Sequence, residues 1–151
     1  MKIDYTDSLS NLILQCQFGQ DGNNFNKLVT FGRFPFRGEG IKEFEYEMMQ
    51  FSCKTSTLSI FEDIKKKDVS RPWVAAGIEH GLWVAKVHPE KQANLAIVTL
   101  GSIGKIANVD HVPVFGVNTY GHNLTVCRSD LGWLPGCEQF LIVRPILPQI
   151  H

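Results

Sequence analysis

IKEFEYEMMQFSCKTSTLSIFEDIKKK, the sequence of residues 41–67, changes its periodicity halfway along. In the first half, bulky apolar side chains alternate one by one with acidic ones. The apolar members are Phe44, Tyr46 and Met48, and the acidic members are Glu43, Glu45 and Glu47. A period of two is typical of a strand with one buried and one solvated face, so we predict a strand over 41–53. We interpret the three carboxylates as its solvated face.

The second half of this stretch predicts a helix over 57–67. Leu58, Phe61 and Ile64 recur at three-residue steps, which places them on one helical face. A hydroxyl residue just before the start can cap the helix. The three lysines at its end lie where the helix dipole favours cations. One strand is therefore followed directly by one helix.

Outside this stretch, short apolar runs separated by glycine, proline and asparagine predict further strands. Three hairpins are predicted, and their strand pairs are 10–18 with 25–34, 82–88 with 95–100, and 112–118 with 124–128. A further strand is predicted over 138–144. Pro72 favours the start of a short second helix that ends at Gly81.

These elements predict an α+β fold in a single globular domain over 1–151. We expect a mostly antiparallel sheet of about seven strands, covered by one or two helices from the middle of the chain. Strands and helices do not alternate regularly, so we expect no repeated parallel βαβ unit.

The charge balance restricts the partners. Lys and Arg number 15, Asp and Glu number 15, and the formal net charge is zero. A nucleic-acid partner is not expected, because phosphate binding usually requires a basic excess. No apolar run approaches the length of a membrane span, and no signal peptide is visible, so we expect a soluble cytoplasmic protein whose four cysteines are thiols. Zero net charge also favours self-association, so a homo-oligomer is compatible with the sequence.

No complete cofactor or metal motif occurs in the chain. The segment GSIGK at 101–105 resembles a phosphate loop, but its glycine spacing is too short and no Ser or Thr follows the lysine. Histidines and cysteines lack the close spacing of structural zinc sites. We therefore expect no cofactor and no metal ion, and we interpret 101–105 as a glycine turn.

A cysteine and two histidines in the C-terminal half suggest nucleophilic catalysis by a thiol. Cys127 could act as a nucleophile with His111 or His122 as its base, oriented by Asp110. Such a group would make the chain a small cysteine-dependent hydrolase or transferase. The alternative is that Cys127 is a strand thiol and His122 a turn residue, since no cysteine-hydrolase motif surrounds them.

Aromatic loops suggest a different function, which we prefer at this stage. The residues expected to contact a ligand are Arg33, Phe34, Arg37, Tyr120 and Trp133. Arg and aromatic side chains are enriched where proteins bind partners, so these loops predict a non-enzymatic module that binds a protein or a small apolar ligand. The alternative is that the aromatic rings pack in the core.

Overall fold

The structure is a computed structural model that describes residues 1–147. The fold is α+β, as predicted, with eight strands and three α-helices in this part of the chain. The strands are β1 (Lys2–Asp4), β2 (Ile41–Met49), β3 (Val74–Ala75), β4 (Ala96–Val98), β5 (Gly104–Ile106), β6 (Val109–Asn118), β7 (Gly121–Arg128) and β8 (Glu138–Pro145). The helices are α1 (Leu9–Gln15), α2 (Thr57–Lys67) and α3 (Ile78–Val87), with a 3₁₀ turn at Pro89–Gln92.

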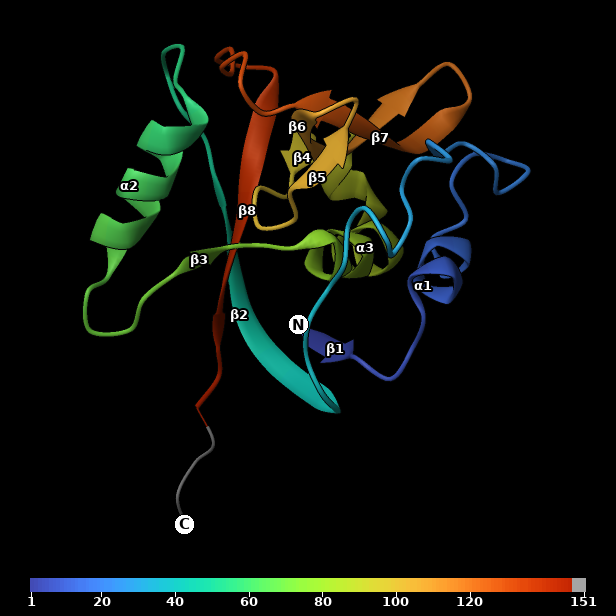
Figure 1. Cartoon of the computed structure of the whole chain (residues 1–151), viewed down its shortest axis with the longest axis horizontal. Coiled ribbons are helices and arrows are strands. Elements are labelled where there is room, and N and C mark those ends of the chain that lie inside the picture. The colour runs from blue at the N-terminus through green and yellow to red at the C-terminus, as the bar shows by residue number, and fades with distance from the viewer. Residues whose placement is uncertain (148–151) are drawn as a thin grey trace.

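The strands form one mixed, curled sheet in the order β1-β2-β8-β4-β6-β5, with β3 pairing with β8 and β7 pairing with β6. The pairing of β4 with β8 is parallel, whereas the other strand pairs described are antiparallel. The sheet is therefore not purely antiparallel. Figure 1 shows α2 on one side of the long β2–β8 pair and α1 and α3 on the other.

Both faces of the sheet are covered, so side chains of the central strands alternate between two cores. Along β8, Leu141 and Val143 enter a first core that also contains α1 and α3. Phe140 and Ile142 enter a second core, which α2 covers with Ile60 and Ile64. Burial on both faces explains why β8 is apolar at four consecutive positions, 140–143, rather than at every second one.

One predicted helix, one predicted hairpin and the predicted strands over 41–53 and 138–144 are confirmed, the last as β8 (Glu138–Pro145). Helix α2 spans Thr57–Lys67, and the Ser56 hydroxyl caps it by accepting a hydrogen bond from the Ser59 amide at 3.1 Å. The hairpin β6–β7 has the expected strands, with Val112 opposite Cys127. The strand predicted over 41–53 forms as β2, although it ends at Met49.

The predicted strand over 10–18 is wrong, because this segment contains α1 (Leu9–Gln15). Its apparent alternation concealed a helical pattern in which Leu9 and Ile13 are buried while Leu14 is 64% exposed. The Ser8 hydroxyl caps the helix by accepting from the Asn11 amide. The partner strand predicted over 25–34 is also absent, since the chain there runs through turns with one bridge from Phe25 to Leu124.

Within 72–100, the predicted strand over 95–100 is confirmed as β4 (Ala96–Val98), but the other predicted elements are wrong. The short helix predicted from Pro72 to Gly81 is replaced by β3, and α3 covers the predicted strand at 82–88. Helix α3 buries Ile78, Leu82, Val84 and Ala85, so no polar face interrupts its apolar pattern. The predicted hairpin of 82–88 with 95–100 therefore does not form, and β4 pairs with β6 and β8 instead.

Candidate functional site

The structure separates the predicted catalytic residues. In the hairpin β6–β7, His111 lies opposite Arg128 and Cys127 lies opposite Val112. Opposed residues share a face and successive residues alternate, so His111 and Cys127 point to opposite faces of the sheet. His122 pairs with Val117, five residues along the strand from Cys127, which is roughly 17 Å.

Each of the predicted catalytic residues has its contacts with groups other than its predicted catalytic partners. Burial, followed by the nearby charge of Glu138, raises the pKa of the half-buried Cys127 thiol. His111 Nδ1 lies 2.8 Å from the Val109 carbonyl oxygen, and Asp110 is paired with Lys105 Nζ at 2.6 Å. A nucleophilic thiol requires a lowered pKa and a base within reach. Neither is found at Cys127 among the described residues.

The predicted ligand-binding residues lie in three separate places. Trp133 is 5% exposed in the second core, where its indole donates to the Thr57 hydroxyl at 2.9 Å. Tyr120 is 76% exposed at the tip of the β6–β7 hairpin. Arg33, Phe34 and Arg37 belong to a loop that crosses in front of α3 (Figure 1). Phe34 is fully buried in the first core, whereas both arginines are exposed.

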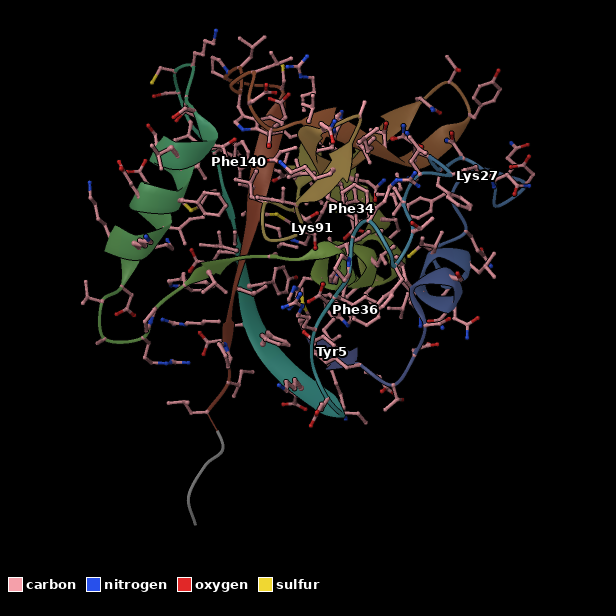
Figure 2. The ribbon with its side chains drawn as sticks, in the orientation of Figure 1. Tyr5, Lys27, Phe34, Phe36, Lys91 and Phe140 are labelled. Atoms are coloured by element: carbon pink, nitrogen blue, oxygen red, sulfur yellow. The ribbon has the colours of Figure 1, made fainter. Side chains whose placement is uncertain are left out.

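The loop around Arg37 is held down on its inner side by aromatic packing. Phe36 contacts Tyr5 with ring centroids 5.9 Å apart, and Figure 2 shows these two rings together. The Tyr5 ring also covers Gly38 so closely that a Cβ at that position would lie 2.6 Å from it. The loop is therefore fixed above the start of α3.

A pocket lies between this loop and the start of α3, and we call it the Glu79 pocket. It is lined by Pro35, Phe36, Arg37, Ala75, Gly77, Glu79, His80, Gly101, Ser102 and Ile103. The segment Gly101–Ser102 belongs to the GSIGK sequence, which forms a turn between β4 and β5, as predicted. Ser102 Oγ accepts a hydrogen bond from the Ile78 amide at 2.7 Å and thereby joins this turn to the helix start.

Glu79 is a carboxylate buried in the first turn of α3, with 7% of its surface exposed. Its Oε1 accepts a hydrogen bond from the Tyr5 hydroxyl at 3.2 Å. Its Oε2 has no hydrogen-bond partner among residues 1–147. Burial raises the pKa of Glu79, because the charged form loses its hydration. Burial, with the adjacent Glu79 charge, also raises the pKa of Tyr5.

His80 is 5% exposed and neutral at physiological pH, since burial lowers its pKa to about 4. Its Nδ1 accepts the Gly77 amide proton at 3.0 Å, so the ring carries its own proton on Nε2. The separation of 3.5 Å between His80 Nδ1 and Glu79 Oε1 is therefore not an ion pair at neutral pH. His80 Nε2 has no partner within the described chain.

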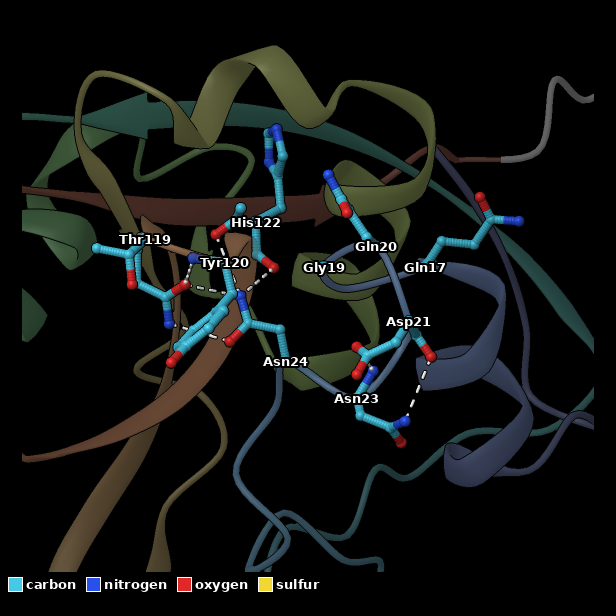
Figure 3. Close-up of a pocket in the computed structure, with 11 residues that line it drawn as sticks. Gln17, Gly19, Gln20, Asp21, Asn23, Asn24, Thr119, Tyr120 and His122 are labelled. Atoms are coloured by element: carbon cyan, nitrogen blue, oxygen red, sulfur yellow. Dashed lines mark hydrogen bonds between the residues drawn. The ribbon is translucent and has the colours of Figure 1, made fainter.

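A second concavity, which we call the amide pocket, lies where the segment 17–24 meets the tip of the β6–β7 hairpin (Figure 3). Its lining is Gln17, Gly19, Gln20, Asp21, Asn23, Asn24, Asn118, Thr119, Tyr120, Gly121 and His122. It thus brings together two of the predicted residues, Tyr120 and His122.

Asn24 ties the two segments of the amide pocket together. Its Nδ2 donates to Asn118 Oδ1 at 2.8 Å and to the carbonyl oxygens of Gly121 and His122. Asn118 donates back to Asn24 Oδ1 at 3.0 Å. Figure 3 shows these bonds around Asn24, with Gln17 and Gln20 extending away from them. One buried atom, His122 Nδ1, has no partner in the part of the chain described.

Sequence reasoning missed Glu79, His80 and Ser102. A signal was present, since Gly77 is followed by a carboxylate and a histidine at the second and third positions of a helix, where anionic and capping side chains are favoured. It could be used only if α3 had been recognised as a helix. Among residues 1–147 there is no group of three or more His, Cys, Asp or Glu side chains that could hold a metal ion.

No family model, curated protein or solved structure matches this chain. None of the helices within residues 1–147 is long and apolar enough to cross a membrane.

Proposed function

We propose that this chain is a non-enzymatic binding module that holds a small ligand in the Glu79 pocket. One observation carries the proposal: Glu79 Oε2 and His80 Nε2 are buried, polar and unpartnered among the described residues, and both side chains line the same pocket. An unsatisfied buried polar atom costs about 1–3 kcal/mol, and native proteins that depart from full satisfaction of polar groups do so at functional sites among others. A ligand that supplied the missing partners would recover this free energy.

The surroundings of these two side chains suit a small molecule. Pro35, Phe36 and Ile103 provide apolar walls, and Arg37 supplies a charged group at the mouth. A pocket with apolar walls and a few polar groups is typical of small-molecule sites. The predicted loop of Arg33–Arg37 therefore contributes one wall of the proposed site, mainly through Phe36 and Arg37.

The protonation of His80 favours binding over catalysis. Ser102, His80 and Glu79 line one pocket and are the residue types of a hydrolase triad. A triad histidine must present a free Nε2 lone pair to the serine and donate from Nδ1 to the carboxylate. Here Nδ1 accepts the Gly77 amide proton, so Nε2 is the protonated nitrogen and cannot act as the base.

The proposal can be tested by screening a chemically diverse fragment library against the ¹⁵N-labelled full chain by NMR. We expect bound fragments to shift the amide resonances of Gly77, Ile78, Gly101 and Ser102. Ile103 is 45% exposed at the pocket, so Ile103→Arg should block these shifts. Leu58→Arg, on the exposed face of α2, is the matched control and should leave them intact. A library that moves none of the four resonances would refute the proposal.

A further inference from the structure

The Glu79 pocket contains two opposite charges that do not neutralise each other. Glu79 is buried, and no Lys or Arg forms an ion pair with it within residues 1–147. Arg37 is exposed and forms no ion pair with any described carboxylate. The pocket lining therefore includes one buried anionic side chain and one exposed cationic side chain, and neither has a counter-ion among the described residues. Charges left in this state favour a ligand that carries both complementary charges.

The fold holds the Glu79 carboxylate in one position. The Tyr5 hydroxyl binds Oε1 from one side. On the other side, Oε2 lies against Gly77, where an added Cβ would approach it to within 2.4 Å. Gly77 and Glu79 both line the pocket, so the unpartnered oxygen, which is buried next to Gly77, belongs to the pocket wall. A fixed acceptor of this kind requires little reorganisation when a ligand binds.

We propose that the Glu79 pocket binds a small zwitterion, of the chemical class of an α-amino acid, with its ammonium group on Glu79 Oε2 and its carboxylate on Arg37. This inference rests on the proposed function and specifies its ligand class. The ammonium supplies the hydrogen bond and the positive charge that Glu79 lacks. The guanidinium of Arg37 offers the paired donors that suit a carboxylate.

The other polar groups of the pocket agree with this assignment. His80 presents an N–H donor at Nε2, which an anionic or neutral acceptor of the ligand can use but a cation cannot. The start of α3 lies beside Glu79, where its partial positive charge favours the ionised form of the Glu79 carboxylate. A simple anion would leave Glu79 unpaired, and a simple amine would leave Arg37 unpaired. A zwitterion satisfies both charges.

Three probes separate these ligand classes by NMR titration of the full chain: L-alanine, propionate and ethylamine. We expect L-alanine to shift the amides of Gly77, Ile78, Gly101 and Ser102. Its affinity should be at least about tenfold higher than that of either single-charge probe, as expected when one charge-assisted hydrogen bond is lost. Equal binding by propionate or by ethylamine would overturn the inference, as would the absence of binding by L-alanine.

Variants identify the two charges that carry the binding. Glu79→Gln and Arg37→Gln should each weaken L-alanine binding at least about tenfold. Glu62→Gln and Lys66→Gln, both on the exposed face of α2, make the same charge changes elsewhere and should leave the affinity within about twofold, as for distant independent sites. Arg37 is exposed, so its variant keeps the test valid even if Glu79→Gln disturbs the fold. An affinity unchanged by Arg37→Gln would overturn the inference.

These results also separate the inference from the proposed function. If library fragments bind the Glu79 pocket but L-alanine does not, the pocket is a ligand site and the zwitterion assignment is wrong. If neither binds there, both statements fail.

Discussion

The amide pocket and the Glu79 pocket are both polar concavities, but their polar atoms are satisfied in different ways. In the amide pocket, the Asn24 amide group makes hydrogen bonds with Asn118, Gly121 and His122, and so joins two segments of the chain. One half-buried side chain of that pocket, His122, keeps its Nδ1 without a partner among the described residues. In the Glu79 pocket, two side chains that are more deeply buried each keep one atom without a partner among the described residues.

The difference separates a structural joint from a candidate binding site. Polar groups that bind one another stabilise the fold and have little capacity left for a ligand. Buried groups without partners reduce stability, and they persist where function requires them. Size alone would favour the amide pocket, whereas the state of the polar atoms favours the Glu79 pocket.

The largest effect is expected at the wall of the Glu79 pocket. A Cβ on Gly101 would lie 2.4 Å from the Ala75 carbonyl oxygen, which is backbone and cannot move freely. We expect Gly101→Ala to lower the free energy of unfolding by about 3 kcal/mol, at the upper end for overpacking. Gly32→Ala is the control, since no heavy atom lies within 4 Å of its Cβ position. Chemical denaturation measures both, and equal stabilities would contradict the tight packing of this wall.

The joint in the amide pocket should give the next largest effect. Asn24→Ala removes the hydrogen bonds to Asn118, Gly121 and His122. We expect a loss of about 2 kcal/mol in the free energy of unfolding, since several bonds of about 1 kcal/mol each are broken at a half-buried position. Gln20→Ala, an exposed residue of the same pocket, should change it by less than about 0.5 kcal/mol. Similar losses in both variants would mean that the pocket has no structural joint.

Cys127 itself lies outside the lining of both pockets and provides a third region for comparison. Burial and the charge of Glu138 raise the pKa of this thiol, which lowers its thiolate fraction. We expect iodoacetamide to label Cys127 in the native protein more slowly than the exposed Cys53 and Cys137, because Cys127 is half-buried and has a lower thiolate fraction. Mass spectrometry of tryptic peptides measures the rates. Rapid labelling of Cys127 at neutral pH would favour the cysteine-dependent alternative.

The smallest expected effect is on the free energy of unfolding and concerns Glu79. It is a stabilisation, whereas Gly101→Ala and Asn24→Ala are expected to destabilise the protein. Burial raises its pKa above the ordinary 4.5, so the folded state binds this proton more tightly than the unfolded state. Stability attributable to Glu79 is therefore fully present at low pH and is lost as the pH rises through the raised pKa. We expect Glu79→Gln to stabilise the unliganded protein by about 1 kcal/mol at pH 8, with a smaller gain near pH 4.5.

The control for that measurement is the pH series itself. His80, whose pKa burial lowers to about 4, is neutral in both proteins at pH 8, so the difference between them at that pH reports on Glu79. Glu62→Gln, an exposed carboxylate on α2, should show no gain at either pH. A destabilisation by Glu79→Gln at pH 8 would show that Glu79 has a cationic partner.

The elements that could be predicted from sequence are those whose signals are local. Helix α2 combines one apolar face with a Ser56 cap, and the β6–β7 hairpin joins neighbouring segments. Helix α3 was missed because it is buried on several sides and lacks a polar face. The parallel pairing of β4 with β8 joins distant segments, and no local pattern encodes it.

The residues of the candidate site likewise include some that the sequence could predict and some that it could not. Arg37 could be predicted from its exposed position among aromatic residues in a loop. Glu79 could not, because a carboxylate in a helix is usually solvated, and its burial depends on Tyr5 being brought to it by the tertiary fold. The separation of Cys127 from His111 depends on strand register, which places them on opposite faces.

The most direct test of the account is a ¹³C NMR titration of the glutamate side-chain carboxyls in the full chain, with the Glu79 signal assigned by its loss in Glu79→Gln. The account predicts that Glu79 titrates above the ordinary 4.5 in the free protein. It also predicts that saturating L-alanine lowers this pKa, because the ligand ammonium stabilises the charged carboxylate. A Glu79 pKa at or below 4.5 in the free protein would contradict the central claim that its carboxylate is buried without a counter-ion.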